Sequence, residues 1–271
     1  MRDETVPERA IGVFDSGVGG LTVLRELRSQ IPDEPLVYLG DTARVPYGTK
    51  SPPTVLRYAH EAARFLLDQR VKLLVVACNT ASAVALDDLA ECYQVPVIGV
   101  IEPGARRALE VTRNGRIGVV GTEGTIRSGA YERALMSGRS DVVVHAAACP
   151  LFVPLAEEGW ACHEVARLAA REYLAPLLEE KIDTLVLGCT HYPLLKQTLQ
   201  EVVGPDVQLV DSAQETAKAV ASRLDGSQLL HQTTAAQLPR YFVTDIPDRF
   251  KRVGGAFLGE ELHGVITVSL D

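Results

Sequence analysis

Short apolar runs alternate with helix-like segments along most of this 271-residue chain. Each run holds a few Val, Ile or Leu residues and ends at turn-forming residues, a pattern typical of strands buried in a parallel sheet. Between the runs, apolar residues recur at helical spacing, for example at Leu21, Leu24 and Leu27. The alternation predicts an α/β protein with mainly parallel sheets.

The chain carries this pattern twice. Residues 73–82 read LLVVACNTAS and residues 184–193 read TLVLGCTHYP, so each copy has a strand that ends in a cysteine. Residues 11–20 (IGVFDSGVGG) and 117–126 (IGVVGTEGTI) form a second matching pair. Further strands are predicted at residues 36–39, 142–144 and 207–210, and helices at residues 55–67, 81–93, 164–178, 194–203 and 215–224. The sequence therefore predicts two βαβαβ-like units.

We expect the two units to be domains related by pseudo-twofold symmetry, with the active site in the cleft between them. The predicted boundaries place residues 1–98 and 211–271 in domain 1 and residues 99–210 in domain 2. Residues 96–103 are interpreted as a strand and a crossover between the units. Residues 228–239 are polar and predict a surface loop, and the final VITVSL predicts a strand added to the first sheet.

Composition excludes several classes of protein. The N-terminus has no apolar segment, and no apolar run approaches the roughly 18 residues of a membrane helix, so we expect a cytoplasmic protein without a signal peptide. Five cysteines, an odd number without close spacing, indicate free thiols in a reducing compartment. The net charge of −8, without a Lys/Arg cluster, disfavours nucleic-acid binding.

The two repeated cysteines indicate chemistry at one site. Ligands in parallel sheets gather at the carboxyl ends of strands, where Cys78 and Cys189 are expected. If the two units face each other, the thiols flank one cleft, and one can remove a proton from a carbon while the other delivers one from behind. A thiol suits both tasks because its ordinary pKa is about 8.5. Asp15, Glu157 and His191 are the titratable candidates to position the thiols or receive an ammonium group.

Lys and Arg are absent from the segments DSGVGG, VPYG, ACNTAS, GTEGT and GCTHYP. An anionic substrate would therefore be held by helix N-termini and by hydroxyl and amide donors. The candidate donors are Ser16, Asn79, Thr80, Thr122 and Thr190.

The motifs DSGVGGLTVL, DTARVPYG, ACNTAS, GTEGTI, ACPLFVPLAEEG and GCTHYPLL occur in this order. Together they resemble the signature blocks of the glutamate racemase family, and the resemblance runs from Ile11 to about Gly259. It implies a cofactor-independent enzyme, without metal, that interconverts L- and D-glutamate and supplies D-glutamate for peptidoglycan. Some members carry a longer N-terminal extension linked to activation by a peptidoglycan precursor, and we expect no such regulation here. Whether the chain forms a homodimer is left open.

The resemblance also implies roles for single residues. Cys78 matches the thiol that takes the proton from D-glutamate, assisted by Asp15. Cys189 matches the thiol that takes the proton from L-glutamate, assisted by His191 with Glu157. The positions that match substrate contacts of the family are Asp15, Ser16, Pro46, Tyr47, Gly48, Asn79, Thr80, Thr122, Thr125, Thr190 and His191.

Other functions stay open at this point. Aspartate racemases share the cysteine pair, although the His-Tyr-Pro after the second thiol favours glutamate. A Rossmann-like nucleotide-binding protein is the main alternative of another class, but Thr22 stands where the third glycine of G-x-G-x-x-G belongs. A thiol-and-histidine zinc site lacks the usual C-x₂₋₄-C spacing. A non-catalytic binding module would tolerate loss of either thiol.

Single residues also have plain structural interpretations. Asp15 could cap the following helix, Glu157 could be a solvated charge, and His191 could be satisfied by backbone groups. Cys92 and Cys149 are interpreted as packing residues. Cys162 is interpreted as a surface residue that lies beside His163 by coincidence.

Overall fold

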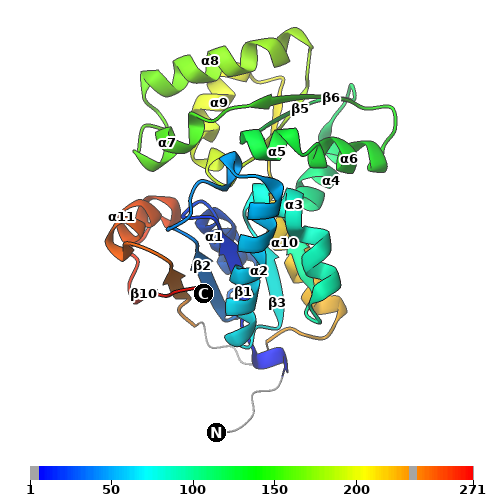
Figure 1. Ribbon diagram of the computed structural model, residues 1–271. Helices are drawn as coiled ribbons and strands as arrows, with labels where there is room; N and C mark the ends of the chain where they lie inside the picture. Colours follow the sequence, from blue (N-terminus) through cyan, green and yellow to red (C-terminus); the bar gives the residue numbers. More distant parts are fainter. Residues whose placement is uncertain (1–5, 232–236, 271) are drawn as a thin grey trace, which may run out of the picture.

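The computed structural model describes residues 6–231 and 237–270, which build two α/β units, one above the other in Figure 1. The lower unit is built on a six-stranded sheet in the order β10-β9-β2-β1-β3-β4, and the upper on a four-stranded sheet in the order β6-β5-β7-β8. All strand pairs in both sheets are parallel. This confirms the predicted α/β class with mainly parallel sheets.

The first sheet contains β1 (Ile11–Asp15), β2 (Leu36–Gly40), β3 (Leu73–Val76), β4 (Val97–Gly99), β9 (Arg240–Val243) and β10 (Val265–Thr267). The second sheet contains β5 (Arg116–Gly121), β6 (Val143–Ala148), β7 (Thr184–Gly188) and β8 (Gln208–Asp211). Strands β5 to β8 pair in the same order as strands β1 to β4. The repeat in the sequence is therefore a repeat in topology.

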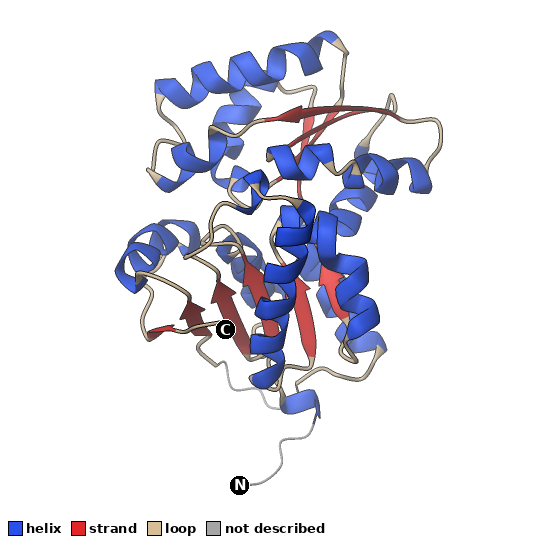
Figure 2. Ribbon diagram, viewed as in Figure 1, coloured by secondary structure: helices blue, strands red, loops and turns tan. Residues whose placement is uncertain are grey.

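Helices cover both faces of each sheet (Figure 2). The α-helices are α1 (Leu21–Gln30), α2 (Pro52–Asp68), α3 (Asn79–Cys92), α4 (Ile101–Val111), α5 (Glu123–Arg127), α6 (Ala130–Gly138), α7 (Phe152–Glu157), α8 (Glu164–Glu179), α9 (Lys196–Val203), α10 (Ser212–Gly226) and α11 (Pro247–Leu258). Short 3₁₀ turns are η1 (Val6–Glu8), η2 (Tyr47–Thr49) and η3 (Tyr192–Leu195). No helix of the described ranges is long and apolar enough to cross a bilayer.

Alternate residues of the central strands point into different cores, as the pleat of a strand requires. Val13 belongs to a core shared with α1 and α10, whereas its neighbour Phe14 belongs to a core shared with α2 and α3. The core that contains Val13 continues into the second unit and includes Leu187 and Tyr192. The two units therefore pack through one continuous apolar cluster.

Some elements differ from the prediction. Residues 96–103, interpreted as a strand and crossover, form the short strand β4 and then the beginning of helix α4. The predicted strand at residues 142–144 is longer and shifted, as β6. The final VITVSL does add strand β10 to the first sheet, next to β9. Residues 232–236 of the predicted loop at 228–239 lie outside the described residues.

Candidate active site

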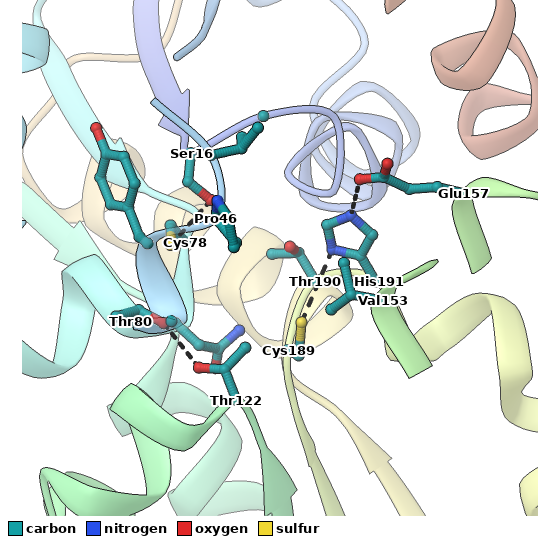
Figure 3. A pocket seen from close by; sticks show the side chains of 15 residues that line it. Ser16, Pro46, Cys78, Thr80, Thr122, Val153, Glu157, Cys189, Thr190 and His191 are labelled. Carbon is teal, nitrogen blue, oxygen red and sulfur yellow. Dashed lines mark hydrogen bonds and ion pairs between the residues drawn. The ribbon is translucent and has the colours of Figure 1, made fainter. Parts of the chain in front are cut away.

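A cavity of about 450 Å³, counting the part open to solvent, lies where the carboxyl ends of strands from both sheets meet (Figure 3). Its first-unit residues follow β1, β2 and β3, and its second-unit residues follow β5 and β7 or belong to α7. The lining residues are Ser16, Gly17, Val45, Pro46, Tyr47, Gly48, Cys78, Asn79, Thr80, Thr122, Val153, Glu157, Cys189, Thr190 and His191.

The two repeated cysteines line this cavity, one from each unit (Figure 3). Cys78 follows β3 and is the N-cap residue of α3, and Cys189 comes directly after β7. Each residue is only 5% exposed. Both are free thiols, so neither sulfur is consumed by a disulfide.

A chain of polar contacts extends from the Cys189 sulfur. The Nδ1 atom of His191 lies 3.8 Å from Cys189 Sγ, and its Nε2 atom lies 3.1 Å from Glu157 Oε1 (Figure 3). On the other side of Glu157, Arg249 Nη2 donates to Oε2 at 2.9 Å. Both nitrogens of the His191 ring thus have side-chain partners, and a purely backbone-satisfied histidine is excluded.

These contacts decide the charge of the histidine. Burial alone would lower the pKa of His191, but its hydrogen bonds with Cys189 and Glu157 outweigh burial and raise this pKa to about 10. Burial likewise opposes ionisation of Glu157, yet His191 and then Arg249 bring the pKa of Glu157 below its ordinary value. At neutral pH an imidazolium therefore lies between a carboxylate and the Cys189 sulfur.

The first thiol has the opposite surroundings. Burial, followed by the charge of Asp15, raises the pKa of Cys78 to about 12, although hydrogen bonds from Ala81 N–H and with Ser16 work against this. The Cys78 thiol donates to Ser16 Oγ at 3.5 Å. Burial also raises the pKa of Asp15. Cys78 is therefore a protonated thiol at neutral pH.

Asp15 lies behind the cavity wall and is 1% exposed. Its carboxylate accepts from Gly17 N–H at 2.9 Å and from Thr190 Oγ1 at 3.5 Å. Within the described ranges no hydrogen bond joins Asp15 to Cys78, so Asp15 acts on that thiol through its charge. The hydrogen bond from Gly17 to Asp15 stabilises the turn after β1. Asp15 does not cap α1, because the N-cap residue of that helix is Gly20.

Asn79 offers an unused donor to the cavity. Tyr131, from α6 of the other unit, donates to Asn79 Oδ1 at 2.7 Å. The Asn79 Nδ2 atom is buried and has no hydrogen-bond partner among the described residues. A buried amide without a partner is costly, so this atom is available to donate to an acceptor group of a ligand in the cavity.

Hydroxyl groups form the neighbouring wall. Thr80 Oγ1 lies 2.9 Å from Thr122 Oγ1 and 3.2 Å from Thr125 Oγ1, so three hydroxyls from both units meet. Thr125 is 1% exposed and lies behind Thr122. Tyr47 contacts the cavity too, but its hydroxyl donates to Asp41 and is not available to a ligand.

Two glycines allow the units to approach each other here. A Cβ atom on Gly48 would lie 2.6 Å from Thr122 Cβ, and one on Gly19 would lie 2.2 Å from Thr190 Oγ1. Any residue with a side chain would push the loops apart at these points. Because the glycine-rich turn after β1 is covered by Thr190 and His191, it has no room for the phosphates of a dinucleotide.

Of the residues predicted from the sequence, all line the cavity except Asp15 and Thr125, which lie directly behind it. Sequence reasoning missed Gly17, Val45 and Val153. Gly17 and Val45 are adjacent in sequence to the predicted residues Ser16 and Pro46, and Val153 lies in the ACPLFVPLAEEG motif. Cys149 is buried and Cys162 exposed as predicted, but the interpretation of Cys92 as a packing residue is wrong, because it is exposed at the end of α3.

The two α/β units have matching topology, and each places one thiol on the shared cavity, an arrangement expected of an enzyme with paired acid-base groups. The Asp/Glu/hydantoin racemase family matches residues 11–220. The glutamate racemase of Geobacter metallireducens is 60% identical over 98% of both chains. The crystal structure of glutamate racemase isoform RacE1 from Bacillus anthracis has a TM-score of 0.93 and 42% identity, covering 97% of this chain and 98% of that one.

A further solved structure, glutamate racemase from Francisella tularensis in complex with D-glutamate, has a TM-score of 0.92 and 41% identity, covering 98% of this chain and 99% of that one. These similarities extend over nearly the whole chain. The chain belongs to the Asp/Glu/hydantoin racemase family and, within it, to the glutamate racemases.

Proposed function

We propose that this protein interconverts L- and D-glutamate without a cofactor, by proton transfer at Cα between two thiols. The observation that carries the proposal is the unequal pair: Cys189 lies beside an imidazolium, whereas burial, followed by the charge of Asp15, keeps Cys78 protonated. A base and an acid on a single cavity are what a two-base racemase needs.

In the direction from L-glutamate, the Cys189 thiolate takes the Cα proton and becomes a thiol. The electron pair left on Cα delocalises into the substrate carboxylate, and Cys78 then gives its proton to the opposite face of the planar carbon. The product is D-glutamate, with the thiol and thiolate exchanged. The reverse reaction starts from this exchanged state, with Cys78 as base and Asp15 close enough to influence its proton.

We assign substrate binding to the donors that face the cavity. The Asn79 Nδ2 atom needs an acceptor, and α3, whose N-terminus lies beside Cys78, offers backbone N–H groups to a carboxylate. Thr80 and Thr122 present hydroxyls on the same wall. Among the described residues, the cavity lining contains no Lys or Arg, so both carboxylates of the substrate would be held by neutral donors and by the charge of His191.

We also propose that the enzyme works in the cytoplasm and supplies D-glutamate for peptidoglycan. The five free cysteines support a reducing compartment. The peptidoglycan role follows from the reaction that the family resemblance implies.

The reaction is tested by circular dichroism of the purified protein, incubated separately with L-glutamate and L-aspartate and with no cofactor added. We expect the signal of L-glutamate to decay to zero and that of L-aspartate to persist. Decay with aspartate alone would assign the site to aspartate, and no decay with either would contradict racemisation of an acidic amino acid.

A further inference from the structure

A second group of reactive side chains lies far from the cavity, on the outer side of the first unit. Helices α2 and α3 pack against each other, His60 comes from α2, and Asp88 and Cys92 come from successive turns of α3. Cys92 is the last residue of α3, whereas Asn79 at the cavity is the first. At about 1.5 Å per residue, the two ends of α3 are roughly 20 Å apart.

The three side chains point their donor atoms at one place. His60 Nε2 lies 2.6 Å from Asp88 Oδ1, and Cys92 Sγ lies 3.6 Å from the same oxygen. All three donor atoms lie within 4.8 Å of one another. Tetrahedral zinc, with bonds of about 2.0 to 2.3 Å, needs donor atoms roughly 3.3 to 3.8 Å apart, so small side-chain rotations suffice to bind it.

The histidine is already oriented for this task. Its Nδ1 atom lies 3.0 Å from the Tyr93 hydroxyl, and the two rings pack at a centroid distance of 5.7 Å. This contact fixes the ring so that Nε2 faces Asp88. Metal-binding histidines are held in the same way, by a hydrogen bond on the nitrogen away from the metal.

The donor set and its surroundings favour one kind of ion. Imidazole, thiolate and carboxylate groups are all ligands that tetrahedral zinc accepts. Calcium and magnesium prefer oxygen ligands, so the sulfur of Cys92 disfavours them. Asp88 and Cys92 are exposed, so a water molecule can complete the coordination.

We propose that His60, Asp88 and Cys92 form a zinc site that ties α2 to α3, with water as the fourth ligand. The ion would join two helices whose N-terminal ends adjoin the cavity, but it would not contact the reacting atoms. Its expected effect is on stability and not on turnover. With zinc at a hundredfold excess over its Kd, the melting temperature should rise by roughly 5 to 10 °C.

The test uses cobalt as a spectroscopic substitute for zinc. The full chain carrying Cys78→Ala and Cys189→Ala, which removes the thiols of the cavity, is titrated with Co²⁺. We expect one equivalent to bind with a thiolate-to-cobalt absorption band and tetrahedral visible bands, and zinc to displace it. Adding Cys92→Ser should abolish the thiolate band and weaken zinc binding at least tenfold, and adding His60→Ala should weaken it similarly.

Cys162→Ser is the matched control. Cys162 is also an exposed thiol next to a histidine, but it does not belong to the cluster of His60, Asp88 and Cys92. It should leave the cobalt spectrum and the zinc affinity unchanged. In the otherwise native chain, Cys92→Ser should keep glutamate turnover within twofold. A thiolate band that survives Cys92→Ser, or no saturable zinc binding by calorimetry, would overturn the proposal without touching the racemase assignment.

Discussion

Cys78 and Cys189 occupy equivalent positions in two related units, yet their neighbours carry opposite charges. His191 places positive charge beside Cys189, and Asp15 places negative charge near Cys78. The two thiols therefore lie in different electrostatic surroundings, although their positions in the two units are equivalent.

Replacing either thiol of the cavity should nearly abolish racemisation. We expect Cys78→Ser or Cys189→Ser to lower kcat/KM by about 10³-fold or more, ~4 kcal/mol of transition-state stabilisation, because a hydroxyl is a far weaker acid than a thiol. Packing should change little, so the far-ultraviolet circular dichroism spectrum should be native. Cys162→Ser, at an exposed position, serves as the control and should stay within twofold. Similar losses in all three variants would indicate thiols with a structural role only.

The charge of His191 should make stability depend on pH. Its pKa in the folded protein, about 10, lies above the value of about 6.5 in an unfolded chain. The folded state thus binds this proton more tightly, so the stabilisation is complete below about pH 6.5 and is lost as the pH rises through about 10. Between pH 7 and 10.5, the melting temperature should fall by roughly 2 to 8 °C more than in His191→Asn. Parallel curves for the two proteins would contradict a protonated His191.

Arg249 is expected to position Glu157 without touching substrate. Its guanidinium donates to the carboxylate oxygen that His191 does not use. In Arg249→Met, the pKa values of Glu157 and His191 should both rise, because a nearby positive charge is removed. We expect kcat from L-glutamate to decrease about fivefold to tenfold, because Glu157 is no longer held in place, with the alkaline limb of the pH profile shifted to higher pH and partial rescue by Lys.

The control for this substitution is Arg252→Met, an exposed arginine on the same helix. It removes one positive charge from α11 but leaves the Glu157 carboxylate paired. If both variants showed the same pH profile as the native enzyme, Arg249 would have no positioning role.

At the scale of elements, the sequence predicts best where the hydrophobic pattern is strong. The central strands β1, β3, β5 and β7 are buried along nearly their whole length, and their apolar runs are visible in the sequence. Helices α4 and α11 were missed, because Pro103 and Gly104 in α4 and Gly254 and Gly255 in α11 are poor helix formers. These helices are stabilised by packing between distant segments, which local pattern does not report.

The site residues, too, could be predicted where a local pattern marks them and could not where only the fold brings them together. Residues within the repeated motifs could be predicted, because each motif ends a strand. Arg249 and Tyr131 could not, since α11 and α6 carry no motif and reach the site only through the folding of the whole chain. The exposure of Cys92 could not be predicted from the sequence either, because it depends on which end of α3 faces solvent.

The turn between β1 and α1 should tolerate no side chain at its closest contact with the second unit. A Cβ atom on Gly19 would meet Thr190 Oγ1 at 2.2 Å and His191 Nδ1 at 2.5 Å. Gly19→Ala should therefore displace His191 and lower kcat/KM at least a hundredfold, ~2.7 kcal/mol. Gly226→Ala, at the end of α10 with open space around it, is the matched control and should be fully active. Equal activity of both variants would mean that the units need not approach this closely.

At the scale of the whole molecule, helices α10 and α11 join the two units. Helix α10 follows β8 of the second sheet and packs against α1 of the first unit, and Arg249 of α11 reaches Glu157 on α7. The division into residues 1–98 with 211–271 and residues 99–210 stays a prediction. The chain crosses from the first unit to the second and returns. A movement of one unit relative to the other should therefore change the distance across the cavity, while each thiol stays fixed at the end of its own sheet.

This arrangement predicts where each proton comes from. If Cys189 removes the Cα proton of L-glutamate and Cys78 protonates the opposite face, the hydrogen in the D-glutamate product derives from Cys78, whose S–H exchanges with solvent before substrate binds. In deuterated water, D-glutamate formed in the first turnovers should carry deuterium at Cα. Unreacted L-glutamate should stay largely protiated, because the proton that Cys189 takes from it cannot exchange with solvent while substrate fills the cavity. Mass spectrometry of the separated enantiomers at early conversion measures both. A single base would return the same proton to either face, so protiated D-glutamate at early times would refute the two-thiol mechanism even for an enzyme that racemises glutamate.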